Sequence, residues 1–321
     1  MNITVILCTY NRCASLPRAL ASVAASELPS AVKWEVLVVD NNSTDETRAV
    51  VEEFCHLHPG RFRYLLERRQ GLSQARNAGI REARGEVLAF MDDDVTVESS
   101  WLRNLTANLR DTDWAGAGGR ILPERSFSPP PWLSLHGPYG LGGVLALFDR
   151  GDKPGELDWV PFGTNMAFRR SMFDKYGEFR TDLGRCGDQL LSGEDTEFGH
   201  RLVRGKERLR YEPLAVVYHP VPENRLRKEY FLAWYFDFGR SLIRESGRGP
   251  DIWGMPRPYF SIVKKAATSM VIFAFRWMVA MNPQERFFNK VMVWWQAGQI
   301  VEMYRLANPG KPQNEQCNAH N

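Results

Sequence analysis

Cysteine is scarce in this chain, and the few cysteines are not arranged in pairs. The sequence has 321 residues, of which 5 are cysteines, and no two of them form a Cys-x-x-Cys motif. A disulfide scaffold and a structural zinc site are therefore not expected, because both need closely spaced or even-numbered cysteines. We expect the reduced thiols of an intracellular protein at all five positions, which are Cys8, Cys13, Cys55, Cys186 and Cys317.

An excess of one charge sign is also missing. The chain has 41 Lys and Arg residues against 38 Asp and Glu residues, which gives a net charge of +3. No block of basic residues alternates with aromatic residues, as a groove for single-stranded nucleic acid requires. The sequence therefore predicts no nucleic-acid partner.

Long uninterrupted apolar runs are absent too. The most apolar segment, residues 259–281, is interrupted by two lysines and an arginine, so its continuous apolar stretches fall short of the ~18 residues that a spanning helix needs. Only two residues precede the apolar run Ile3–Leu7, and no basic region or cleavage site of a signal peptide is visible. We expect a cytoplasmic protein, with the inner face of the cell membrane as the alternative position.

The last third of the chain is basic and rich in aromatic residues. Residues 221–321 contain 14 Lys and Arg against 8 Asp and Glu. Its segments 259–281 and 287–303 have the spacing of helices with one apolar face. Such a helix, flanked by Lys, Arg and Trp, can lie in a lipid interface, and the alternative is that it packs on the protein's own core or on a second subunit. Peripheral membrane contact and an oligomer both stay open.

The first two thirds alternate between strand and helix patterns. Short apolar runs at residues 3–7, 35–39 and 87–91 are separated by helical patterns at Leu16–Ala25 and Leu72–Ala83. This alternation predicts an α/β fold with a mostly parallel sheet flanked by helices. We expect one α/β domain over residues 1–220 and a helical extension over residues 221–321.

Three aspartates follow the third apolar run. Carboxylates packed as closely as Asp92, Asp93 and Asp94 repel one another and raise one another's pKa unless a cation compensates. Asp92 and Asp94 point the same way along an extended backbone, and their hard oxygen atoms suit Mg²⁺ or Mn²⁺. The alternative is a solvated turn that caps the following helix.

Two other polar clusters end strands at the same predicted sheet edge, where ligands of such sheets bind. Cys8–Arg12 places an aromatic ring, a hydroxyl and a cation after the first strand, and Asp40–Asp45 follows the second. Each alone is a plausible turn. Together with the aspartate cluster they offer groups suited to a nucleotide diphosphate.

These clusters, taken with two further motifs, resemble family 2 glycosyltransferases with a GT-A fold. The resemblance covers about residues 1–220 and rests on five motifs in order: Thr9–Arg12, Val38–Asp45, Gly71–Gly79, Asp92–Asp94 and Gly193–Asp195. It implies a metal-dependent transfer of a sugar from a nucleotide-diphosphate donor to an acceptor hydroxyl, with inversion at the anomeric carbon.

The resemblance also implies roles for particular residues. Asp195 would be the catalytic base and Glu194 either assists it or orients the acceptor. Asp94, Asp92 and His219 would hold the Mn²⁺ or Mg²⁺ ion. The donor would be bound by residues from several motifs, which are Thr9, Tyr10, Arg12, Asp40, Asn42, Arg76, Asp92, Asp93, Asn165 and Arg225.

The donor base and the acceptor are less constrained. UDP is expected because the family mostly uses it, with dTDP and GDP as alternatives. The acceptor would be a glycan or a lipid-linked sugar in cell-surface polysaccharide or glycolipid synthesis. Trp132, Tyr139 and Trp159 offer a stacking platform for it, and the alternative for each is packing in the core or in a loop. Two readings of another class remain, a nucleotidyltransferase and an inactive sugar-nucleotide-binding protein.

Overall fold

The computed structural model describes residues 2–110, 112–157, 161–186, 190–246, 251–252 and 255–307, with the backbone alone over 251–260. The chain divides into two compact units. The first unit comprises Met1–Arg125, Ala146–Thr181 and Glu194–Pro220, and the second comprises Ser126–Leu145, Asp182–Gly193 and Val221–Asn321. The second unit therefore draws on two short segments that interrupt the first in sequence.

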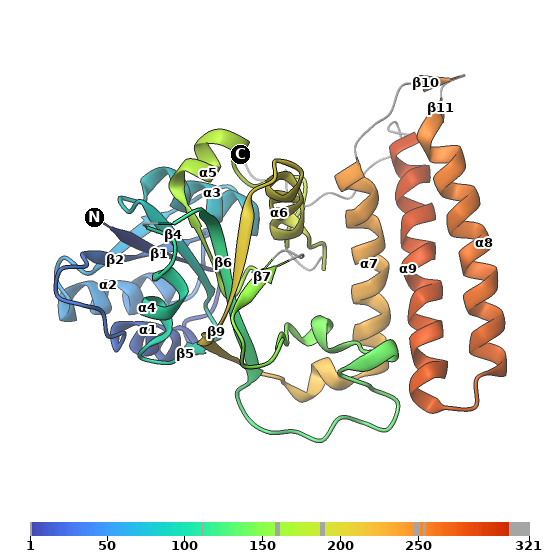
Figure 1. The fold of residues 1–321 in the computed structure, drawn as a ribbon, viewed down its shortest axis with the longest axis horizontal. Coiled ribbons are helices and arrows are strands. Elements are labelled where there is room, and N and C mark those ends of the chain that lie inside the picture. Colours follow the sequence, from blue (N-terminus) through green and yellow to red (C-terminus); the bar gives the residue numbers. More distant parts are fainter. Residues whose placement is uncertain are drawn as a thin grey trace. The chain divides into compact units, whose positions relative to one another are not determined.

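A mixed sheet forms the centre of the first unit (Figure 1). Nine strands in the described part of the chain build it, in the order β3-β2-β1-β4-β8-β6-β9-β5, with β7 paired to β9. Strands β3, β2, β1 and β4 are parallel, whereas β8 is antiparallel to both β4 and β6. The strands are β1 (Ile3–Thr9), β2 (Trp34–Asp40), β3 (Phe62–Leu66), β4 (Val87–Asp92), β5 (Thr96–Val97), β6 (Trp114–Pro123), β7 (Gly155–Leu157), β8 (Met166–Arg169) and β9 (Arg208–His219).

Helices cover both faces of this sheet, because the side chains of each strand alternate between two apolar clusters. Ile3, Val5 and Leu7 of β1 pack into one cluster, whereas Ile6 packs into the other. The first cluster includes residues of α1 (Leu16–Ala24), α2 (Thr47–Leu57) and α4 (Trp101–Thr106). The second includes residues of α3 (Leu72–Glu82), α5 (Arg170–Tyr176) and α6 (Glu194–Arg204).

The strand register brings the polar clusters to one edge of the sheet. Thr9 pairs with Asp40 in the parallel β1–β2 ladder, and Cys8 pairs with Asp92 in the β1–β4 ladder. The prediction that these clusters end strands at a shared edge is therefore confirmed. Strand β9 also runs in the direction of β4, since it is parallel to β6 and β6 and β4 are both antiparallel to β8. His219 consequently ends its strand at the same edge.

Some details differ from the sequence predictions. Strand β3 was not predicted, because its sequence Phe-Arg-Tyr-Leu-Leu is short and interrupted by charge. Of the cysteines, Cys8, Cys13 and Cys55 are free, but Cys186 is disulfide-bonded, so the expectation of reduced thiols is wrong there. Cys317 lies outside the described residues.

The segment between Ile121 and Trp159 contains several short regular elements. Strand β6 continues to Pro123, and the 3₁₀ turns η1 (Gly137–Tyr139) and η2 (Gly142–Leu145) precede β7. Trp132 packs edge-on against Phe231 and Phe287, with ring centroids 5.4 and 4.5 Å away, so within the second unit it is part of an aromatic core. Trp159 lies outside the described residues.

The second unit is built on α7 (Lys228–Ser246), α8 (Arg257–Val279) and α9 (Pro283–Ala307), which lie side by side (Figure 1). It also holds η3 (Glu223–Leu226) and the short hairpin of β10 (Asp251–Ile252) and β11 (Met255–Pro256). Helix α9 packs against both α7 and α8. Helices α7 and α9 can approach closely because Gly239 and Gly298 have no side chain. A Cβ added to either glycine would collide with a backbone carbonyl oxygen of the other helix. Within the described residues, no helix has the length and apolar character that crossing a membrane requires.

Candidate active site

A buried arginine joins three elements at the edge of the sheet. Arg76 of α3 is 3% exposed. Its Nη1 lies 2.5 Å from Oε1 of Glu194 on α6, and its Nη2 lies 3.5 Å from Oδ1 of Asp92 at the end of β4. Gly163 lies directly on the guanidinium, where an added Cβ would collide with Arg76. The cation therefore holds two of the predicted site carboxylates in fixed positions.

The neighbouring carboxylate, Asp195, lies half-buried in the first turn of α6. Its Oδ2 accepts a hydrogen bond of 2.8 Å from the backbone N–H of Gly163, and its Oδ1 accepts one of 2.7 Å from the N–H of Thr196. Oδ1 also accepts a hydrogen bond of 3.3 Å from Thr196 Oγ1. Because each carboxylate oxygen has two lone pairs, Oδ2 keeps capacity for a further donor. Asp195 is thus oriented by hydrogen bonds, whereas Glu194 is held in an ion pair with Arg76.

The environment of Glu194 disfavours its charged form. Burial is the main cause and the charge of Asp195 adds to it, while Arg76 opposes the shift, and the pKa of Glu194 is raised to about 6. Glu194 is 4% exposed. The two adjacent acids therefore sit in different environments, one buried against a cation and one open to a ligand.

The aspartate cluster carries excess negative charge. Burial raises the pKa of Asp93 to about 7, and the charges of Asp94 and Asp92 act in the same direction, whereas Arg12 opposes them. Asp92, Asp93 and Asp94 are each half-buried. Because these carboxylates repel one another, a divalent cation bound among them would stabilise their ionised forms.

The donor atoms suit a hard divalent ion in their chemistry. Asp92 and Asp94 offer carboxylate oxygens, and His219, which is 4% exposed, ends β9 at the same sheet edge. In the described part of the chain, no three His, Cys, Asp or Glu side chains converge closely enough to hold a metal ion. The residues that would hold a metal are therefore at one edge without forming a complete ligand set.

Asp40 belongs to a second polar cluster at this edge. Its side chain is buried, with Oδ2 accepting a hydrogen bond of 2.8 Å from Tyr64 Oη and Oδ1 accepting one of 2.9 Å from the N–H of Ser43. Burial, followed by this hydrogen bond to Asp40, raises the pKa of Tyr64 to about 12. Tyr64 was missed because strand β3 was missed. Thr9 is buried opposite Asp40 in the register, and Tyr10 beyond it is 44% exposed.

The loops after β1 and β2 are tied together. Asn11 donates its N–H to Ser43 Oγ at 2.9 Å and accepts the N–H of Thr44 at 2.8 Å. The exposed Arg12 donates its N–H to Thr47 Oγ1 at 3.3 Å. Asn42 is exposed and has a φ of 65°, which an asparagine tolerates better than most residues. The loops that carry these predicted donor-binding residues are thus held together.

Asn41 was not singled out from the sequence, yet it organises this edge. Its buried amide nitrogen donates to the carbonyl oxygens of Glu67 at 3.1 Å and Arg69 at 2.7 Å, and its Oδ1 accepts the N–H of Gly71 at 2.8 Å. Gly71 precedes α3 with a φ of 130°, a conformation that favours glycine. Asn41 therefore fixes the start of the helix that carries Arg76.

Two further residues were predicted to bind the donor, Asn165 and Arg225. Asn165 is fully buried, and its amide bonds the carbonyl oxygens of Arg120 and Ala215 and the indole N–H of Trp101, all at 2.9 Å. The structure therefore uses this side chain to join strands and α4. Arg225 lies half-buried in η3, which belongs to the second unit.

Comparison with known proteins identifies the family. A model of glycosyl transferase family 2 matches residues 4–177. Succinoglycan biosynthesis protein ExoM of Rhizobium meliloti (strain 1021) is 30% identical over 253 residues, 78% of this chain and 77% of that protein. Glucosyl-dolichyl phosphate glucuronosyltransferase of Haloferax volcanii is 25% identical over 237 residues, 72% of this chain and 73% of that protein.

A solved structure has a similar fold. Mannosyltransferase PcManGT from Pyrobaculum calidifontis, solved in complex with GDP-Man and Mn²⁺, superposes with a TM-score of 0.61 at 20% identity, over 97% of this chain and 88% of that chain. The sheet of parallel strands with an antiparallel insertion is therefore the expected GT-A fold. By the match of the family model and of ExoM, the chain belongs to glycosyl transferase family 2 and is a glycosyltransferase.

Proposed function

We propose that this enzyme transfers a sugar from a nucleotide-diphosphate donor, UDP-sugar in the first place, to an acceptor hydroxyl with inversion. The observation that carries the proposal is the pairing of Arg76 with Glu194, beside which Asp195 of α6 is oriented by the N–H groups of Gly163 and Thr196. The catalytic domain is residues 1–220, and residues 221–321 form its helical extension. Family membership gives no support to the nucleotidyltransferase alternative or to an inactive binding protein.

The proposed mechanism is a single displacement. Asp195 accepts the proton of the acceptor hydroxyl as that oxygen attacks the anomeric carbon, and the N–H groups of Gly163 and Thr196 hold its carboxylate in place. Glu194 serves a different purpose, because its ion pair with Arg76 keeps it turned to the protein. Asp40 and Thr9 line the pocket for the base.

A divalent cation completes the proposed site. Asp92 and Asp94, with His219, would hold Mn²⁺ or Mg²⁺, which when bound supplies positive charge for the departing diphosphate. The relative PcManGT, solved with GDP-Man and Mn²⁺, supports this assignment. Arg12, Asn42 and Asp93 from the same edge are proposed to contact the nucleotide. For Asn165 and Arg225 the donor-binding role stays a prediction.

A donor panel with matched variants tests the proposal. We expect hydrolysis or transfer from one of UDP-glucose, GDP-mannose and dTDP-glucose that depends on MnCl₂. Asp195→Asn should lower kcat by about 100-fold or more, the usual contribution of a general base. Asp174→Asn, an exposed aspartate on α5, is the control and should keep full activity. Normal turnover by Asp195→Asn would remove Asp195 as the base.

The acceptor is proposed to be a growing glycan or a lipid-linked sugar in polysaccharide or glycolipid synthesis. The names of two relatives support this, since one is a succinoglycan biosynthesis protein and the other acts on a glucosyl-dolichyl phosphate. An acceptor of this kind would be presented at a membrane surface.

Helix α8 offers a surface for such a membrane. Five apolar residues recur at helical spacing and are 46 to 69% exposed, which are Val271, Ile272, Phe275, Met278 and Val279. Exposed basic residues lie on the same helix, at Lys264, Lys265 and Arg276. Apolar side chains flanked by cations match the chemistry of an anionic lipid interface. We therefore propose that α8 touches the inner face of the cell membrane.

A further inference from the structure

The segment Asp182–Gly193 leads directly to the proposed catalytic residues. It belongs to the second unit by its contacts, although Thr181 before it and Glu194 after it belong to the first. The chain passes from Ser192 through the single residue Gly193 to Glu194, the first residue of α6. Whatever holds Ser192 therefore restrains the start of the helix that carries Glu194 and Asp195.

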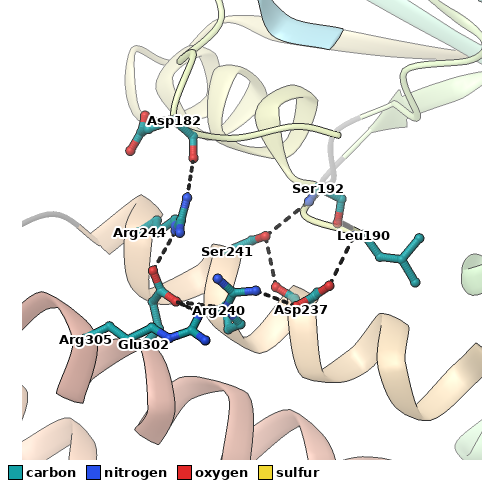
Figure 2. Close-up of polar contacts among 9 residues, drawn as sticks. All are labelled: Asp182, Leu190, Ser192, Asp237, Arg240, Ser241, Arg244, Glu302 and Arg305. Atoms are coloured by element: carbon teal, nitrogen blue, oxygen red, sulfur yellow. Dashed lines mark hydrogen bonds and ion pairs between the residues drawn. The ribbon is translucent and has the colours of Figure 1, made fainter. Parts of the chain in front are cut away.

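Three hydrogen bonds hold this segment on α7 (Figure 2). The N–H of Leu190 donates to Oδ2 of Asp237 at 3.1 Å, and the N–H of Ser192 donates to Oγ of Ser241 at 3.2 Å. Near its other end, Arg244 Nη1 donates to the carbonyl oxygen of Asp182 at 3.2 Å. Asp237 and Ser241 lie four residues apart, on successive turns of one face of α7. Their side chains accept hydrogen bonds from the backbone N–H groups of Leu190 and Ser192.

A buried acid on α9 is linked through arginines to Asp237. Glu302 is 1% exposed and accepts hydrogen bonds from Arg240 Nε at 2.9 Å and Arg244 Nε at 2.7 Å. Arg240 Nη1 then donates to Oδ1 of Asp237 at 2.8 Å (Figure 2). Arg305 Nη1 also lies 3.9 Å from Oε2 of Glu302, so both acids face cations, as buried ionic groups require. Packing of α7 against α9 does not require the bonds that Asp237 and Ser241 accept from the backbone of Leu190 and Ser192. These bonds therefore point to a second role for the two side chains.

We propose that Asp237 and Ser241 are positioning residues for the transfer reaction, acting through the Leu190–Gly193 backbone on the start of α6. The inference rests on the proposed role of Asp195. In the proposal, Asp237 and Ser241 contact neither the donor nor the acceptor. Replacing them should therefore change kcat and leave the KM for the donor unchanged. Glu302 and Arg240 support them from behind.

Hydrogen exchange of the full chain tests the positioning directly. The variant Ser241→Ala removes the acceptor for the N–H of Ser192, and we expect faster exchange both at residues 190–193 and in the first turns of α6. Ser246→Ala is the matched control, because this exposed serine on the same helix donates to the carbonyl oxygen of Ile243 of its own helix. The control should leave the exchange of α6 unchanged. Unchanged exchange of α6 in both Ser241→Ala and Asp237→Ala would overturn the inference.

Kinetics give the second measurement, with MnCl₂ and whichever of UDP-glucose, GDP-mannose and dTDP-glucose turns over fastest. Ser241→Ala should lower kcat by about 3- to 10-fold, the effect of one ordinary hydrogen bond, with an unchanged KM for the donor. An equal loss in Ser246→Ala, or a change in KM alone, would contradict positioning. If Asp195→Asn is inactive while Ser241→Ala and Asp237→Ala keep wild-type kcat, only this inference fails. If Asp195→Asn stays active, the proposed function fails and the inference with it.

Discussion

Arg76 and Glu194 form a buried ion pair between residues that lie 118 positions apart in the chain. Their side chains are 4% and 6% exposed, so water does little to screen either charge. Such a pair contributes less net stability than its short distance suggests, yet removing one partner leaves an uncompensated buried charge. The pair therefore fixes the site more than it stabilises the fold.

Replacing Arg76 should be costly. We expect Arg76→Met to lower the free energy of unfolding by about 3–5 kcal/mol, because Glu194 would remain buried without its cation. The double variant Arg76→Met/Glu194→Gln should recover part of this loss. Urea denaturation at pH 7 measures both. Arg48→Ala, which breaks the exposed pair with Glu52, is the control and should change stability by less than about 1 kcal/mol. If Arg76→Met lowers the free energy of unfolding as little as Arg48→Ala does, the loss of its cation does not destabilise the buried Glu194.

The stability of the second unit should depend on pH through Glu302. Burial acts to raise the pKa of this carboxyl, but Arg240 and Arg244 outweigh it, and the pKa is lowered from its ordinary value of 4.5. A depressed carboxyl pKa contributes stability that is present above pH 4.5 and is lost as the pH falls through the folded-state pKa. Wild type should therefore be more stable than Glu302→Gln at pH 7, and the difference should shrink below pH 4.5. Urea denaturation across this range measures it. A constant difference would show that the charge of Glu302 is not the cause.

Tyr64 should matter for nucleotide binding because it orients Asp40. Tyr64→Phe removes the hydroxyl that donates to Asp40 Oδ2, and one hydrogen bond to a charged group is worth about 1.5–3 kcal/mol. We expect a Kd for UDP, measured by calorimetry with MnCl₂, that is at least about 10-fold higher. Tyr218→Phe, which removes a similar bond of 2.7 Å to Glu98, is the control and should bind normally. Equal Kd values for UDP in the two variants would contradict a role of the Tyr64–Asp40 hydrogen bond in nucleotide binding.

The exposed face of α8 should bind anionic lipid. Flotation of the full chain on phosphatidylglycerol vesicles should be lost in the double variant Val271→Glu/Phe275→Glu, since each charge opposes insertion of that face. Leu214→Glu changes an apolar residue of the first unit that is 65% exposed, and should float like the wild type. If the double variant floats normally but changes from a dimer to a monomer by light scattering, α8 binds a second copy and the lipid proposal is wrong.

Much of the fold follows from local patterns. The runs that became β1, β2 and β4 are apolar and end in polar residues, and these ends lie at one sheet edge because parallel strands share a direction. Helix α3 was predicted from the helical pattern at Leu72–Ala83. Strand β3 was not, since Arg63 interrupts its short apolar run and binds the buried Glu35 at 2.8 Å, a partner that no local pattern reveals.

The order of the motifs along the chain already determined the family, the sheet edge that carries the chemistry and the acids at the start of α6. Only the tertiary structure decided which of these acids is paired with Arg76, that Asn165 faces the interior, and that Asp237 and Ser241 hold the segment before α6. The physical reason is range. Periodicity and strand ends are set by neighbouring residues, whereas a buried ion pair or hydrogen bond forms between side chains that meet only after the chain has packed.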